Sequence, residues 1–155
     1  MTYLFLMCFM PFLATKTAIP LVPHDQHPPG IALHPVRPNA RAVLDKFTLP
    51  HPAEIKLVIG CGCWLRRVEN RPQYATAETL ISNPKYDPTP EQPNHDALVE
   101  FLRQHFTADG FVEFYGCIDG DYAEPAREHL SLSVEDIRDR YFHLRVGSHY
   151  RLLFG

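Results

Sequence analysis

The clearest periodic pattern of apolar residues lies between residues 94 and 106. Its apolar positions recur close to the 3.6-residue helical period and share one face: Leu98, Phe101, Leu102 and Phe106. Asn94 is a suitable N-cap, and Gly110 follows as a residue that adopts positive φ without a steric penalty. The pattern therefore predicts an amphipathic helix over residues 94–106 that packs one side on the core.

A pattern with a period of two residues follows this helix, at residues 111–118. One face collects Val112, Phe114 and Ile118, and the other collects Glu113, Tyr115 and Cys117. A shorter apolar run at residues 55–59 predicts a second strand. If the two strands are parallel neighbours, the helix between them is their crossover, and we expect a right-handed connection.

The C-terminal part of the chain predicts a short helix and a hairpin. Ser133 followed by Asp136 has the spacing of a capping box, which predicts a short helix that ends near Arg140. Alternating residues on either side of Gly147 predict a β-hairpin of residues 141–146 and 150–154. A three-residue loop at 147–149 gathers the apolar side chains on one face, whereas a two-residue loop would place Arg151 there.

The N-terminal part has a different composition. Residues 2–13 are almost wholly apolar, and prolines cluster between residues 20 and 52. The apolar run is either the hydrophobic part of a signal peptide or a buried strand. Proline fixes φ and removes the amide donor, which favours an extended arm. We therefore expect residues 1–52 to be this apolar segment plus a proline-rich arm, and residues 53–155 to be a compact α+β domain. That domain would have a small mixed β-sheet with two main helices and a C-terminal β-hairpin.

Composition limits the classes of partner. The 155-residue chain has a formal net charge of -3 and no long basic run, so we expect no nucleic-acid partner. The apolar run at residues 2–13 is shorter than the roughly 20 residues that span a bilayer, so we expect no stable membrane span. We favour a cytoplasmic protein; secretion is the alternative if residues 1–18 are a signal peptide.

The most informative local feature is the sequence Cys61-Gly62-Cys63, which follows the predicted strand at residues 55–59. Cys117 lies near the end of the predicted strand at 111–118, so a parallel pairing would bring the three thiols to one edge of the sheet. Zinc prefers thiolate ligands and four-fold coordination, with His129, His149 or Asp119 as candidate fourth ligands; we select His129. The alternatives are buried structural thiols and a redox-active or reactive pair.

Two short stretches bear a family resemblance. The sequence from Leu57 to Cys63 resembles the glycine-rich first motif of S-adenosylmethionine-dependent methyltransferases. The sequence from Ser82 to Tyr86 resembles the Asn-Pro-Pro-Tyr motif with which that family holds a target amino group, with Lys85 in place of the second proline. The resemblance implies a glycine turn that lets the backbone approach the cofactor, in a divergent methyltransferase-like protein.

Our leading functional interpretation is a protein-interaction module, not an enzyme, with a structural zinc or thiol cluster. Long loops on rigid scaffolds often carry binding sites, and the connection from residue 64 to residue 93 is such a loop. Trp64 and Tyr74 are the candidate contact residues in it. The alternatives are a thiol-dependent enzyme that uses Cys61 or Cys63, and the divergent methyltransferase.

Overall fold

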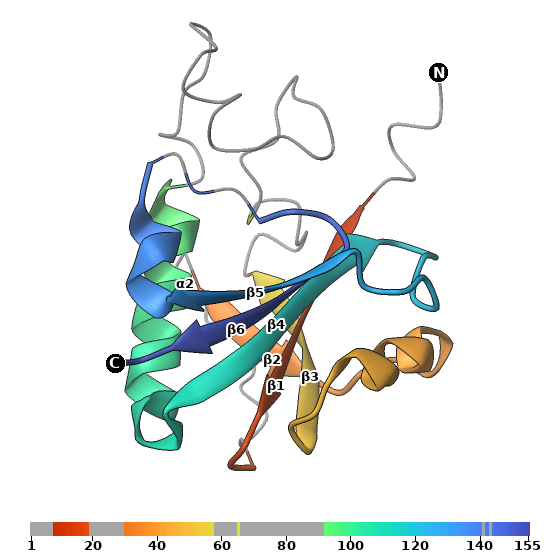
Figure 1. The fold of residues 1–155 in the computed structure, drawn as a ribbon, viewed down its shortest axis with the longest axis horizontal. Coiled ribbons are helices and arrows are strands. Elements are labelled where there is room, and N and C mark those ends of the chain that lie inside the picture. The colour runs from red at the N-terminus through yellow and green to blue at the C-terminus, as the bar shows by residue number, and fades with distance from the viewer. Residues whose placement is uncertain (1–7, 19–29, 58–64, 66–91, 141, 143) are drawn as a thin grey trace, which may run out of the picture.

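The computed structural model describes residues 8–18, 30–57, 65, 92–140, 142 and 144–155. They form an α+β fold with one mixed six-stranded sheet and one main α-helix, α2 (Gln92–Phe106) (Figure 1). The strands are β1 (Phe9–Thr15), β2 (Ile31–His34), β3 (His51–Leu57), β4 (Phe111–Ile118), β5 (Glu128–Ser133) and β6 (Ser148–Leu153). Their order across the sheet is β2-β3-β1-β4-β6-β5, and only β5 and β6 form a parallel pair.

The described part of the N-terminal apolar run is a central strand of the sheet. β1 lies between β3 and β4 and is antiparallel to both, and Phe9, Phe12 and Leu13 are fully buried. Pro11 is tolerated there because its missing N–H coincides with the end of pairing to β3, which starts only at Phe12. A run of aromatic and branched residues is therefore buried on both sides of the sheet.

The described part of the expected arm contains regular structure. β2 and the 3-10 helix η2 (Pro38–Lys46) both lie within residues 1–52, and both pack into the same domain as the rest of the chain. Proline at the start of η2 is compatible with helical geometry, because the first amide groups of a helix need no partner within it. The boundary at residue 53 falls inside β3.

The strands before and after α2 are not the parallel neighbours that a shared thiol site requires. β3 and β4 run in the same direction, but β1 lies between them, so they are not neighbours. Two strand spacings, roughly 10 Å, separate them. The antiparallel pattern also differs from the parallel doubly wound sheets that carry glycine-rich nucleotide-binding turns, so the fold gives the methyltransferase resemblance no support.

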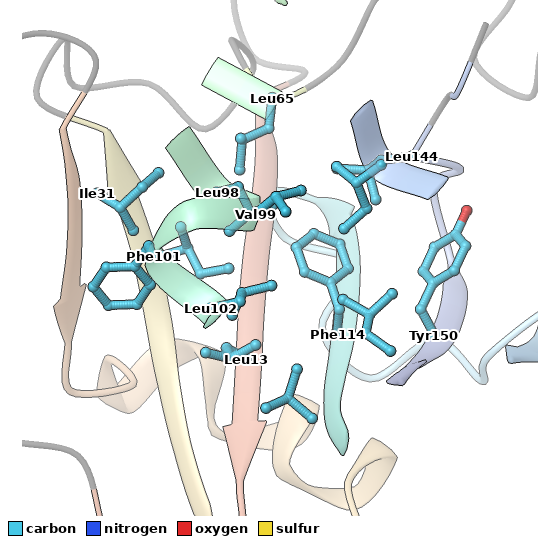
Figure 2. Packing of buried hydrophobic residues seen from close by; sticks show 14 of the residues in the cluster. Leu13, Ile31, Leu65, Leu98, Val99, Phe101, Leu102, Phe114, Leu144 and Tyr150 are labelled. Atoms are coloured by element: carbon cyan, nitrogen blue, oxygen red, sulfur yellow. The ribbon is translucent and has the colours of Figure 1, made fainter. Parts of the chain in front are cut away.

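The main core lies between α2 and the sheet. Leu98, Val99 and Leu102 of α2 pack over Leu13 of β1 and Phe114 of β4 (Figure 2). All four apolar helix residues that the 3.6-residue period selects are buried. Each such side chain contributes about 1.5–3 kcal/mol of hydrophobic stabilisation. The helix is followed by Gly110, which adopts a φ of 83° as the sequence predicts.

A buried histidine joins three segments at one end of this core. His95 of α2 is fully buried, and its two ring nitrogens lie 3.0 Å from the carbonyl oxygen of Ile137 and 2.5 Å from that of Leu65. Ile137 belongs to the short 3-10 helix η5 (Val134–Arg138), which packs beside α2. η5 begins with the expected capping box, in which Ser133 and Asp136 satisfy each other's backbone amides. The second of the two expected helices is thus a short 3-10 helix.

The opposite face of the sheet is covered by η2, and Figure 1 shows η2 and α2 on opposite sides. Phe12, Tyr115 and Cys117 pack there with Ala40 and Val43 of η2. Because η2 covers this face and α2 covers the other, both faces of β4 are buried, although one of them carries Glu113. At this position Glu113 requires partners within the protein.

The expected C-terminal hairpin is not formed by the described residues. β6 is paired on both sides, with β4 on one side and with β5 on the other, so no position in the sheet remains for a strand before Gly147. The expected apolar face is nevertheless formed, because Leu144, Val146, Tyr150 and Leu152 are buried in one cluster. The sequence pattern thus identified the buried side chains but not the strand that pairs with them.

Among the described helices, none has the length and apolar character needed to cross a membrane.

Candidate binding site

The polar centre of the η2-covered face is the carboxylate of Glu113, which is 2% exposed. It accepts hydrogen bonds from the amide nitrogens of Thr48, at 2.9 Å, and Leu49, at 2.6 Å, and from the Thr48 hydroxyl at 3.0 Å. His149 of β6 donates through Nε2 at 2.6 Å. Glu113 therefore fixes the chain that leaves η2 to the middle of the sheet.

A second buried carboxylate holds the start of η2. Glu54 of β3 is 1% exposed and accepts from Arg37, through the backbone amide at 3.2 Å and Nε at 2.9 Å. Lys56 lies 3.3 Å from its other oxygen. The hydrogen bond to Glu54 raises the pKa of Arg37 above its ordinary value. Two carboxylates from different strands thus hold η2 at both ends, which positions a 3-10 helix of unusual length.

Two histidines form a line of polar side chains that runs from the buried Glu113 towards the surface. His149 lies opposite Tyr115 of β4 and His129 of β5 in the sheet register. The rings of His149 and His129 have centroids 5.1 Å apart. A buried carboxylate that accepts from one imidazole nitrogen fixes the orientation of that ring. His149 is therefore held in place, and the exposed His129 next to it reaches solvent.

A cleft of about 460 Å³ opens where His129 reaches the surface. It lies between η2 and the loop that joins β4 to β5, and its lining residues are Ala42, Asp45, Lys46, Ala123, Pro125, Ala126 and His129. Lys46 donates from Nζ to the carbonyl oxygen of Tyr122 at 3.1 Å and lies 5.5 Å from the Tyr115 ring centroid. The hydroxyl of Tyr122 donates to Asp119, which fixes the other wall. The cleft is therefore bounded by tethered segments on both sides.

Cys117 lies beneath the same loop, beside a smaller cavity of about 130 Å³. It is 2% exposed, and burial, with a further contribution from Asp121, raises the pKa of its thiol to about 12. A thiol at such a pKa is protonated at neutral pH, and the protonated form is a poor nucleophile. In this geometry Cys117 acts as a small apolar core residue.

The residues of the expected metal site are placed as follows. Cys61 and Cys63, like the expected contact residues Trp64 and Tyr74, lie outside the described residues. Cys117 and His129 share a face of the sheet, but β6 separates their strands, which puts them roughly 10 Å apart across the sheet. Within the described part of the chain, no group of three or more histidine, cysteine or acidic residues could hold a metal ion.

The outer edge of β5 is the second candidate surface. β5 ends the sheet and pairs only with β6 among the described residues. The opposite edge strand, β2, has four residues and is followed by Pro35, which limits pairing with another chain. β5 has six residues, EHLSLS, without the lysine or proline that commonly protects an edge strand. The two edges therefore differ in their capacity to accept another strand.

Sequence reasoning named His129 and His149 as candidate metal ligands but missed the cleft and its supporting carboxylate, Glu113. Glu113 and His149 are separated by 36 positions, and their contact depends on β4 and β6 becoming neighbours. The available signal was the carboxylate itself, which stands between apolar residues in a predicted strand that ends in a cysteine. Such a residue requires a buried partner if its face is covered.

No family model, curated protein or solved structure matches this chain.

Proposed function

We propose that this domain is a protein-interaction module that binds an extended segment of a partner chain along the outer edge of β5. The observation that carries the proposal is a six-residue edge strand that, among the described residues, is paired on one side only and contains neither lysine nor proline. Backbone groups at such an edge bind a further strand, each hydrogen bond contributing about 0.5–1.5 kcal/mol.

The edge is prepared for binding because β5 is held in its extended shape. All six of its residues are in register with β6. Leu130 and Leu132 pack against the main core, and the capping box at Ser133 fixes the end of the strand. A strand that is already ordered loses little conformational entropy when it accepts a partner.

The two faces of β5 define the chemistry of the partner segment. Leu130 and Leu132 lie on the α2-covered face, and His129 and Ser131 lie on the η2-covered face, where both are exposed. Side chains of an added strand lie beside those of the strand it joins. The preferred partner therefore alternates apolar residues, which pack beside the leucines, with polar residues on the side of His129.

The test uses the full-length chain and a displayed library of random linear peptides. We expect selection to recover peptides with alternating apolar and polar residues, and we expect the amides of residues 128–133 to become protected from hydrogen exchange in the complex. Each recovered peptide is then synthesised in two forms. One form is N-methylated at the alternate residues whose amides lie on one edge of the extended peptide, and the other form at the residues whose amides lie on the opposite edge. Strand addition predicts that only one of the two forms loses binding, because only one edge of the peptide meets β5.

The matched protein variants are Ser131→Lys and Ser131→Thr. Both keep the exposed position, but lysine introduces the charge that protects natural edge strands, so binding should weaken only in the first variant. Recovery of no binding peptide would overturn the proposal. Equal binding of both methylated forms would do so as well. The described residues provide no observation that favours the thiol enzyme or the methyltransferase.

A further inference from the structure

We propose that the cleft between η2 and the β4–β5 loop binds a small zwitterion of the free amino-acid class, with its ammonium on Asp45 and its carboxylate on Lys46 and His129. This site shares His129 with β5 but does not depend on strand addition.

The size of the cleft suits such a ligand. Its volume of about 460 Å³ lies within the range of roughly 300–1,000 Å³ that is typical of small-molecule sites. Four of its lining residues are small and have no polar side-chain atom: Ala42, Ala123, Pro125 and Ala126. These walls favour an apolar side chain, and the remaining lining residues, Asp45, Lys46 and His129, supply the polar contacts.

The charges of the lining select the class of ligand. An ionised Asp45 only accepts hydrogen bonds, and Lys46 only donates them. A ligand with a negative charge alone would be repelled by Asp45, and one with a positive charge alone would be repelled by Lys46. A zwitterion satisfies both groups, and charge-assisted hydrogen bonds are the stronger kind.

The donors and acceptors of the cleft are open to a ligand. The Lys46 ammonium has three protons; one is donated to the Tyr122 carbonyl oxygen, and the ring of Tyr115 lies beside the group at 5.5 Å. Asp45 is exposed at the mouth of the cleft. His129 carries both a donor and an acceptor nitrogen in its neutral form, so it can add a hydrogen bond to the ligand carboxylate.

The walls are held in place before a ligand binds. Glu113 tethers the end of η2 that carries Asp45 and Lys46, and the bond from Tyr122 to Asp119 tethers the loop. His149, which is held by its hydrogen bond to Glu113, packs beside His129. Tethered walls reduce the ordering cost of binding, which allows a small ligand to be held.

The experiment compares three matched probes: L-leucine, N-acetyl-L-leucine, which lacks the ammonium, and L-leucinamide, which lacks the carboxylate. Binding to the full-length chain is followed by backbone amide shifts in two-dimensional NMR, read at Ala42, Ala123 and Ala126. We expect leucine to saturate the site, and each capped form to bind at least about tenfold more weakly, the loss expected for one charge-assisted hydrogen bond.

The protein variants separate a role in binding from a role in folding. Asp45→Asn should weaken the binding of leucine by a similar factor, because the ammonium contact is lost. It should not weaken the binding of N-acetyl-leucine, whose lone carboxylate is no longer repelled by Asp45. Arg41→Gln, on an exposed residue of η2 outside the cleft lining, is the control and should change neither. The proposal is overturned if leucine fails to saturate at millimolar concentration, or if all three probes bind equally. Neither result bears on strand addition at β5.

Discussion

The strongest test of the architecture is the removal of the Glu113 carboxylate. This group accepts from two backbone amides, one hydroxyl and the His149 ring. Thr48 is exposed and regains water when the carboxylate is lost, whereas Leu49 is partly buried and His149 is 8% exposed. Each buried donor left without an acceptor costs about 1–3 kcal/mol, and the one methylene that alanine lacks adds roughly 0.8 kcal/mol. With two such donors, Glu113→Ala should lower the free energy of unfolding by about 3–7 kcal/mol.

The milder variant Glu113→Gln distinguishes charge from shape. The glutamine oxygen still accepts from the Thr48 and Leu49 amides, but its NH₂ group faces His149, which then has to accept instead of donate. The loss of charge assistance predicts a cost of about 1–2 kcal/mol. Urea denaturation measures both values, with Glu124→Ala, on an exposed loop residue, as a control expected within about 0.5 kcal/mol of the unaltered protein. A cost below about 1 kcal/mol for Glu113→Ala would refute the tethering role of the carboxylate.

Three further predictions follow from buried groups. Gly116→Ala places a Cβ closer than 3.0 Å to the buried ring of Phe9, so it should cost about 1–3 kcal/mol in urea, and Phe9→Leu should recover part of that loss. Burial raises the pKa of Cys117 and of Tyr150 to about 12, from 9.0 and 10.0. The unfolded chain therefore ionises first, and stability should fall as the pH rises from 9.0 towards 12, by up to about 1.4 kcal/mol per unit for each group. A pH-independent urea midpoint over this range would contradict the burial of both groups. His95→Phe leaves at least one of the carbonyl oxygens of Ile137 and Leu65 without its donor and should cost about 1–3 kcal/mol, read as faster hydrogen exchange in α2; unchanged exchange there would contradict the role of His95.

The sequence predicted those features that depend on local spacing. The apolar face of α2, the alternation in β4, the positive φ of Gly110 and the capping box at Ser133 all involve residues a few positions apart. Helical and strand periods determine which of such residues share a face, so the pattern alone identified them. The same reasoning grouped the C-terminal apolar residues correctly.

The tertiary structure decided which strands become neighbours. The hypothesis of a shared thiol site required the strand at residue 55 to lie directly beside that at 111, but a strand from the N-terminal apolar run lies between them. The sequence pattern also predicted a hairpin, although β6 instead pairs with β4 and β5. Strand alternation defines two faces and leaves the choice of partner open, because a backbone edge offers similar hydrogen bonds to any strand.

The candidate site depends on that choice of partner. Glu113, His149 and His129 come from three strands, and Lys46 comes from a 3-10 helix that two buried carboxylates hold on the sheet. In the sequence these residues are isolated polar positions. The sequence by itself determined which side chains need burial or a partner, and the tertiary structure determined which partner each one meets. The reason is that local periods act over a few residues, whereas these contacts join positions far apart in the chain.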